Sequence, residues 1–168
     1  MLARIWRDAG RDVVLENPAV NGFATDELIR EELPLVRTFR PNIITLLIGA
    51  NDIVRGSSER RYRDQLARIH AAIVVDGAST RVVALPQPDW SLAPAGSAFG
   101  DAAGLSRTIE RFNGIAHEEA ERAAARWIDL FPLMREQGRR RMFASDGLHP
   151  SAEAFAEWAR ELADALER

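Results

Sequence analysis

A run of seven residues, Asn42–Ile48, limits the fold of this chain more than any other part of its sequence. The run reads NIITLLI and is apolar almost throughout, which is typical of a central parallel strand covered by helices on both faces. Shorter apolar runs occur at 13–15, 81–85 and 127–130, each next to a helix-like stretch. This alternation predicts an α/β protein with a mostly parallel sheet between layers of helices.

Helices are expected where apolar residues recur every three or four positions. They cover residues 2–9, 25–39, 59–75, 106–125, 132–138 and 151–166. Pro34 lies inside the second stretch and is expected to kink it, because proline lacks the backbone N–H that a helix interior uses. A long loop, 86–104, precedes the helix at 106–125, and loops of that length are often functional.

The 168 residues fit a single domain, 1–168, and their composition excludes several classes of protein. The formal net charge of −3 argues against a nucleic-acid partner, since no net positive field would attract phosphates. Cysteine is absent, and with it disulfides, thiol nucleophiles and cysteine-bound metals. No apolar run reaches the roughly 20 residues of a membrane helix. The start of the chain lacks the apolar core of a secretory signal, so we expect a cytoplasmic protein, although any export signal would lie upstream.

Polar residues suited to catalysis follow the central strand. Gly49-Ala50-Asn51-Asp52 comes directly after Ile48, and ligands of parallel sheets bind at the carboxyl ends of the strands. Asn51 could aim a side-chain N–H at a developing oxyanion there, and Gly22 could aim a backbone N–H at the same point from a neighbouring loop. Taken alone, Gly, Asn and Asp after a strand are also typical of an ordinary turn.

A second motif, Asp146-Gly147-Leu148-His149-Pro150, precedes the last helix. An imidazole that acts as a base needs a carboxylate to fix its tautomer and to stabilise the imidazolium. Asp146 and His149 lie three residues apart in one loop and could form such a pair. Taken alone, the motif also fits a helix-entry loop with Asp as a cap and Pro as a breaker.

In this order, Gly22, the GxND-like segment 49–52 and the DxxHP-like segment 146–150 resemble the SGNH (GDSL-type) hydrolase family across nearly the whole chain. The resemblance implies a three-layer, flavodoxin-like α/β fold and ester hydrolysis by a Ser-His-Asp triad. His149 would be the general base and Asp146 its orienting carboxylate, while Gly22 and Asn51 would form parts of the oxyanion hole. It also implies a small-molecule ester as substrate, with no cofactor and no metal.

The nucleophile of that family is missing from this sequence. The family carries its serine in a Gly-Asp-Ser motif after the first strand, and the one Gly-Asp pair here, Gly100-Asp101, is followed by Ala102. We therefore expect a chain that is truncated at its N-terminus, lacks the first strand and is inactive as it stands. In the strand order 2-1-3-4-5 that strand would separate 13–15 from 42–48. Its loss would leave a gap of roughly 10 Å and an apolar edge prone to aggregation.

Two other functions stay open on the sequence alone. The loop 86–104, with Asp89, Trp90 and Phe99, could line the pocket of a non-catalytic ligand-binding module. A metal-dependent phosphoesterase is the other alternative, because carboxylates at strand ends suit Mg²⁺ or Mn²⁺.

The metal alternative would use Asp52, Asp89, Asp146 and His149, although Asp52 could instead order the Asn51 turn. The other two histidines, His70 and His117, are expected on exposed helix faces. The sequence specifies neither the ester and its acyl group nor the oligomeric state.

Overall fold

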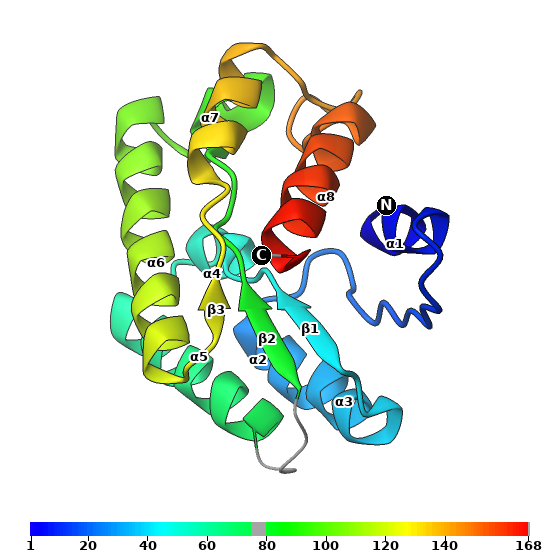
Figure 1. Cartoon of the computed structure of the whole chain (residues 1–168). Helices are drawn as coiled ribbons and strands as arrows, with labels where there is room; N and C mark the ends of the chain where they lie inside the picture. The colour runs from blue at the N-terminus through cyan, green and yellow to red at the C-terminus, as the bar shows by residue number, and fades with distance from the viewer. Residues whose placement is uncertain (75–79, 168) are drawn as a thin grey trace. The chain divides into compact units, whose positions relative to one another are not determined.

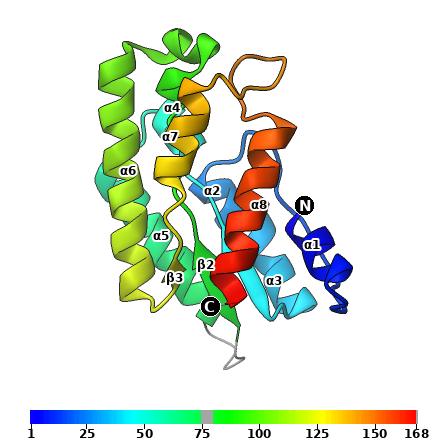
Figure 2. The same ribbon diagram turned by 45° about the horizontal axis from the view of Figure 1, so that its top comes forward.

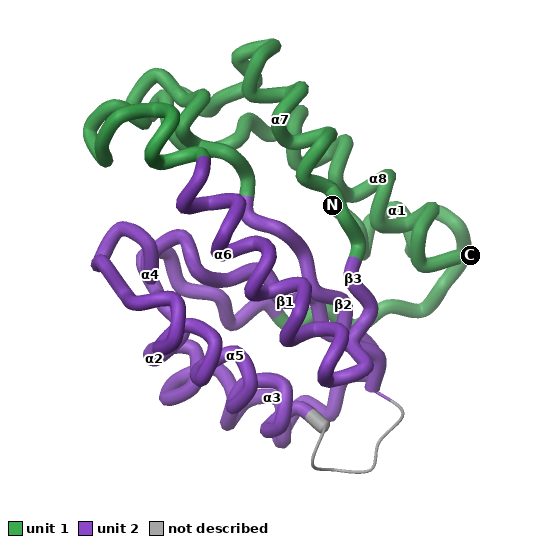
Figure 3. The backbone as a smooth tube through the Cα atoms, turned by 90° about the vertical axis from the view of Figure 1, so that its left-hand side faces the viewer, with its two compact units in different colours: residues 1–16, 88–106, 128–168 green, residues 17–87, 107–127 purple. Residues whose placement is uncertain are grey.

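The computed structural model describes residues 1–74 and 80–167 (Figure 1). These residues belong to two compact units, each of which is interrupted in sequence (Figure 3). Residues 17–87 and 107–127 make up one of them, here called the sheet unit. Residues 1–16, 88–106 and 128–168 make up the other, here called the helical unit.

In the part of the chain that the structure describes, three parallel strands form the sheet, in the order β1-β2-β3 (Figure 1). They span Ile43–Leu46 (β1), Arg81–Ala84 (β2) and Arg126–Trp127 (β3). Ile43 lies opposite Arg81 and Leu46 opposite Ala84. The predicted parallel strands within 42–48 and 81–85 are confirmed. The third strand is shorter than the predicted 127–130 and begins one residue earlier.

Helices of the sheet unit pack on one face of the sheet. Their ranges are Thr25–Glu27 (α2), Leu28–Glu32 (η1), Leu33–Phe39 (α3), Ala50–Val54 (α4), Glu59–Val74 (α5) and Ala102–Arg122 (α6). The first turn of α6, up to Ser106, belongs to the helical unit. Tyr62, Leu66 and Ile69 form the buried stripe of α5, as their spacing predicts. This stripe packs against Leu46 and Val82 of the sheet, with Leu28, Phe112 and Ile115 completing the core.

The helix expected at 25–39 widens in its middle. Leu28–Glu32 forms a π-helical turn, and the α-helix resumes at Leu33. Pro34 explains the widening, because it donates no N–H and its ring would collide with the carbonyl of Arg30, four residues earlier. The kink predicted from Pro34 therefore takes the form of a π turn directly before it.

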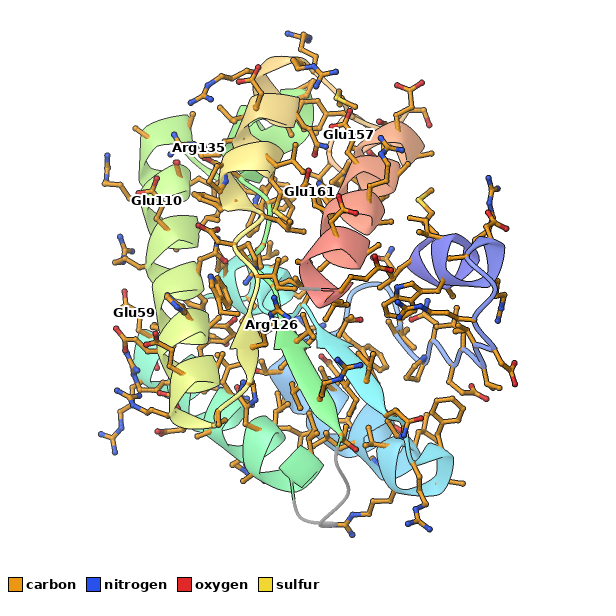
Figure 4. The ribbon with its side chains drawn as sticks, viewed as in Figure 1. Glu59, Glu110, Arg126, Arg135, Glu157 and Glu161 are labelled. Atoms are coloured by element: carbon orange, nitrogen blue, oxygen red, sulfur yellow. The ribbon has the colours of Figure 1, made fainter. Side chains whose placement is uncertain are left out.

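The helical unit contains α1 (Leu2–Asp8), η2 (Trp90–Leu92), η3 (Pro94–Phe99), α7 (Phe131–Arg139) and α8 (Ala152–Glu167). α1 contacts α8 (Figure 2). Gln137 joins α7 to α8, since it donates to Glu157 Oε2 at 2.6 Å and accepts from Trp158 Nε1 at 2.7 Å. Glu157 projects from α8 in Figure 4. The long loop 86–104 is thus ordered by two 3₁₀ turns, η2 and η3, and α6 begins at Ala102, four residues earlier than predicted.

Two predictions from the sequence are wrong. Residues 13–15 form no strand, and Val14 and Leu15 are 76% and 61% exposed. A strand exists only by pairing, and among the described residues the Val13 carbonyl binds the Arg7 guanidinium instead, at 3.0 and 2.6 Å. His70 is not a surface residue, because it is only 3% exposed. It lies one position from Ile69 on the buried side of α5.

Within residues 1–74 and 80–167, no helix combines the length and apolar character needed to cross a membrane.

Candidate active site

Asp146 and His149 form a hydrogen-bonded pair in the loop before α8. His149 Nδ1 lies 2.7 Å from Asp146 Oδ2. The other carboxylate oxygen, Oδ1, accepts the backbone N–H groups of Leu148 at 2.9 Å and His149 at 3.0 Å. The carboxylate thereby fixes both the ring and the backbone of the histidine. Both side chains are about half exposed, at 55% for His149 and 50% for Asp146.

The loop that carries the pair is closed on itself. The Ala144 N–H donates to the His149 carbonyl at 2.8 Å, and Phe143 and Pro150 form an antiparallel bridge. Gly147 sits at the tip with φ +69°, a left-handed conformation that glycine adopts without strain. Its carbonyl accepts the Ala95 N–H at 3.0 Å, which ties the tip to η3. This framework holds Asp146 and His149 at their spacing.

The electrostatics of the loop favour an ionised Asp146. The backbone N–H of Leu148, the His149 side chain and the His149 N–H together lower the pKa of Asp146 from 3.8 to about 2. A carboxylate that stays charged near neutral pH keeps the His149 Nδ1 proton in place and would stabilise a positive imidazolium. The pair can therefore serve as an oriented base.

Gly22 and Asn51 come together in the sheet unit. The Asn51 Nδ2 donates to the carbonyl of Phe23 at 2.9 Å, and the Arg55 guanidinium donates to the carbonyl of Gly22 at 2.7 Å. These bonds tie the Gly22–Phe23 loop to Asn51 of α4 and to Arg55, the residue that follows α4. Gly22 has φ +90°, so its backbone takes a turn that favours glycine.

Gly49 is the N-cap residue of α4, three residues after the end of β1, and no larger residue fits there. Its φ is +127°, and a Cβ there would lie 2.5 Å from the Tyr62 hydroxyl oxygen and would collide with Gln87 Nε2. Both neighbours bind the preceding carbonyl, that of Ile48, at 2.8 Å from Tyr62 and 3.1 Å from Gln87. Burial raises the pKa of Tyr62, so its hydroxyl stays a donor at neutral pH. The turn leading into Asn51 is thus held from two sides.

Asp52 is buried and binds Thr25, the first residue of α2. It is 1% exposed, and its two oxygens accept from the Thr25 N–H at 3.0 Å and the Thr25 hydroxyl at 2.5 Å. The same hydroxyl lies 2.6 Å from the Gln65 side-chain oxygen on α5. Asp52 is therefore committed to the packing of α2 against α4 and α5.

Asp89 and Trp90 are also buried, at 3% and 7% exposed. Asp89 accepts from the Ser91 hydroxyl at 2.5 Å and the Ser106 hydroxyl at 2.8 Å, and it lies 3.5 Å from Arg135 Nε. These contacts fasten the start of the 86–104 segment to α6 and α7, and they occupy the carboxylate. Phe99, in contrast, is 40% exposed.

The structure also uses residues that the sequence did not single out. Asn113 on α6 accepts the Gln87 N–H at 2.8 Å and donates to the Gln87 carbonyl at 3.0 Å. It therefore pairs with the chain just after β2 as a neighbouring strand would. Thr25 and Gln65 are the other such residues. Their pairing across 40 positions leaves no local signal in the sequence.

The described residues offer no donor set for a metal. Among them, no three of His, Asp and Glu gather closely enough to hold an ion. Of the four residues considered for that role, Asp52 and Asp89 are buried and bound internally, and only Asp146 and His149 lie together.

The described residues thus combine an α/β structure, in which a three-stranded parallel sheet is flanked by helices, with a loop that holds an Asp–His pair. The chain belongs to the GDSL-like lipase/acylhydrolase family, whose profile matches residues 1–165. No curated protein matches the sequence.

Solved structures of several esterases share the fold. A lipase/acylhydrolase from Enterococcus faecalis is 20% identical, with a TM-score of 0.76 over 98% of this chain and 82% of its own. The esterase EstA from Pseudoalteromonas sp. is 18% identical, with a TM-score of 0.73 over 99% and 83%. A family 3 carbohydrate esterase from Clostridium thermocellum is 15% identical, with a TM-score of 0.72 over 97% and 81%. At these identities the likeness establishes the fold.

Proposed function

We propose that the chain carries the acid–base and oxyanion-binding parts of a serine ester hydrolase. The observation that carries the proposal is the 2.7 Å contact between His149 Nδ1 and Asp146 Oδ2. It leaves Nε2 as the nitrogen that exchanges protons with a substrate. The family relationship, to lipases and acylhydrolases, supports the same chemistry.

In this proposal His149 Nε2 takes the proton of an attacking hydroxyl while that oxygen bonds to the ester carbonyl carbon. The imidazolium then returns the proton to the leaving alkoxide. Asp146 stays ionised and compensates the positive ring. Water repeats the sequence on the acyl intermediate and releases the carboxylic acid, which regenerates the hydroxyl.

Gly22 and Asn51 would bind the oxyanion that forms on the carbonyl oxygen. The Asn51 amide nitrogen carries two protons, and only one is needed for the Phe23 carbonyl. The second N–H of the Asn51 amide and the backbone N–H of Gly22 would donate hydrogen bonds to the oxyanion. Each such donor is worth a factor of about 10²–10³ in kcat.

The sequence contains no Gly-Asp-Ser, and in this proposal the attacking hydroxyl comes from outside these 168 residues. We propose that this hydroxyl belongs to a serine that follows an additional strand upstream of residue 1. That strand would pair with the edge of β1 that faces away from β2. Ile43 and Thr45 direct their backbone groups to that edge, and no described residue pairs with them. A parallel strand there would end beside the Gly49–Asn51 turn.

Hydrolysis of p-nitrophenyl acetate tests the proposal in two chains. The 168-residue chain is expected to hydrolyse it no faster than its His149→Ala variant. A chain extended along its own reading frame is expected to gain activity that both His149→Ala and replacement of the added serine abolish. An upstream frame of about 60 residues with no strand ending in Gly-Asp-Ser would refute the proposal, as would a His149-dependent rate in the short chain.

A further inference from the structure

Gly22 occupies the third position of a tight turn. The turn covers residues 20–23 and is closed by a hydrogen bond from the Phe23 N–H to the Val20 carbonyl at 3.2 Å. A φ of +90° at the third position is typical of a turn that favours glycine there. The closing bond does not use the N–H of Gly22, so the direction of this N–H depends on how firmly the neighbouring peptide groups are held.

A ring of hydrogen bonds holds the chain from Gly22 to Ala24. The Arg55 guanidinium donates through Nη2 to the Gly22 carbonyl at 2.7 Å, and through Nη1 to the two carboxylate oxygens of Glu27 at 2.7 and 2.8 Å. Glu27 Oε2 in turn accepts the Ala24 N–H at 2.7 Å. The ring thus runs from the backbone through two charged side chains and returns to the backbone two residues later. Gly22, Ala24, Glu27 and Arg55 form this ring, which we call the Arg55 clamp.

The chemistry of the Arg55 clamp depends on a guanidinium. This group is planar, keeps its charge and places its N–H groups at fixed angles, whereas the N–H groups of lysine share one nitrogen. Glu27 is charged as well, because the Ala24 N–H and the Arg55 guanidinium lower its pKa below the ordinary 4.5. The Arg55 and Glu27 side chains are 47% and 19% exposed, and ion pairs near the surface add little to stability. The clamp therefore acts on the geometry of the loop more than on the stability of the fold.

Asn51 binds the same stretch of backbone, since its Nδ2 donates to the Phe23 carbonyl at 2.9 Å, one residue after the carbonyl that Arg55 binds. From this we propose that Arg55, together with Glu27, is a positioning residue that holds the backbone N–H of Gly22 in the direction from which it binds the oxyanion. The inference rests on the proposed function, in which Gly22 and Asn51 donate to that oxyanion. Donors that are fixed in advance need no reorganisation during the reaction, and this makes them effective.

NMR relaxation of the 168-residue chain tests whether the Arg55 clamp fixes the Gly22 N–H. The ¹⁵N order parameter of Gly22 is expected to be about 0.85, the value of rigid backbone, and to fall below about 0.6 in Arg55→Lys. Glu27→Gln leaves one acceptor oxygen in place of two and is expected to lower it as well. Arg63→Lys is the matched control, because Arg63 Nη1 also binds carboxylate oxygens, at 2.6 and 2.9 Å, elsewhere in the same unit. Either clamp variant with the order parameter of the unmodified chain, or an equal loss in Arg63→Lys, overturns the proposal.

Kinetics of the extended chain that contains the added serine separate this inference from the proposed function. With p-nitrophenyl acetate, Arg55→Lys is expected to lower kcat about tenfold and to leave KM within about twofold, because the oxyanion exists only after attack on the ester. The loss is smaller than the factor of about 10²–10³ for removal of a donor, since the Gly22 N–H is still present. Arg63→Lys should leave kcat unchanged. An active extended chain whose kcat is insensitive to Arg55→Lys overturns the inference, whereas an extended chain without His149-dependent hydrolysis overturns the proposed function instead.

Discussion

Replacement of Asp52 by alanine is expected to lower the free energy of unfolding by about 2–4 kcal/mol. Asp52 is 1% exposed and accepts two hydrogen bonds from Thr25, one from its backbone N–H and one from its hydroxyl. After the substitution the hydroxyl can still turn to Gln65, which lies 2.6 Å away. The Thr25 N–H loses the one acceptor that it has among the described residues, so it stays buried without a partner next to the space that the carboxylate filled. An unsatisfied buried group costs about 1–3 kcal/mol, and the lost packing adds to it.

Asparagine at the same position should cost only about 1 kcal/mol. Its carbonyl oxygen can accept the Thr25 N–H, and its NH₂ can donate to the Thr25 hydroxyl, which then donates to Gln65. Urea unfolding followed by circular dichroism measures both losses, and Asp64→Ala on the exposed side of α5 serves as the control. Equal losses for Asp52→Ala and Asp52→Asn would show that these hydrogen bonds do not hold α2 in place.

Two further substitutions probe other parts of the fold. Gly49→Ala should lower the free energy of unfolding by about 3 kcal/mol or more, because it combines a strained φ with a collision against Tyr62 and Gln87; a loss below about 1 kcal/mol in urea unfolding would contradict this packing. Burial lowers the pKa of His70 below its ordinary 6.5, so the unfolded chain binds its proton more readily and stability falls as the pH drops below about 6.5. His70→Gln should remove that part of the fall between pH 7.5 and 5.5, and a pH dependence unchanged by the substitution would contradict it.

The elements with strong local signals are the ones that the sequence predicted. The apolar run at 42–48 became β1, and the stripe of Tyr62, Leu66 and Ile69 became the buried face of α5. Asp146 and His149 were also predictable as a pair, because three residues separate them and one loop can bring them together. In these cases the information lies within a few residues of the chain.

The features that escaped prediction depend on distant partners. The apolar residues 13–15 have strand propensity, but no strand pairs with them among the described residues. His70 looked like a surface residue because its burial depends on packing outside its own helix. The role of Asn113 rests on Gln87, 26 residues away. Asp52 and Asp89 looked available for chemistry, and only the folded chain reveals that their oxygens are occupied.

The position of the ring proton on His149 decides whether Asp146 and His149 form an oriented base. Long-range ¹H–¹⁵N correlation NMR of the 168-residue chain at pH 7.5 identifies which ring nitrogen carries the proton. We expect a proton on Nδ1, an unprotonated Nε2, and loss of this preference in Asp146→Ala. A proton on Nε2 in the unmodified chain, or the same spectrum in Asp146→Ala, would contradict the assignment of the pair as an oriented base.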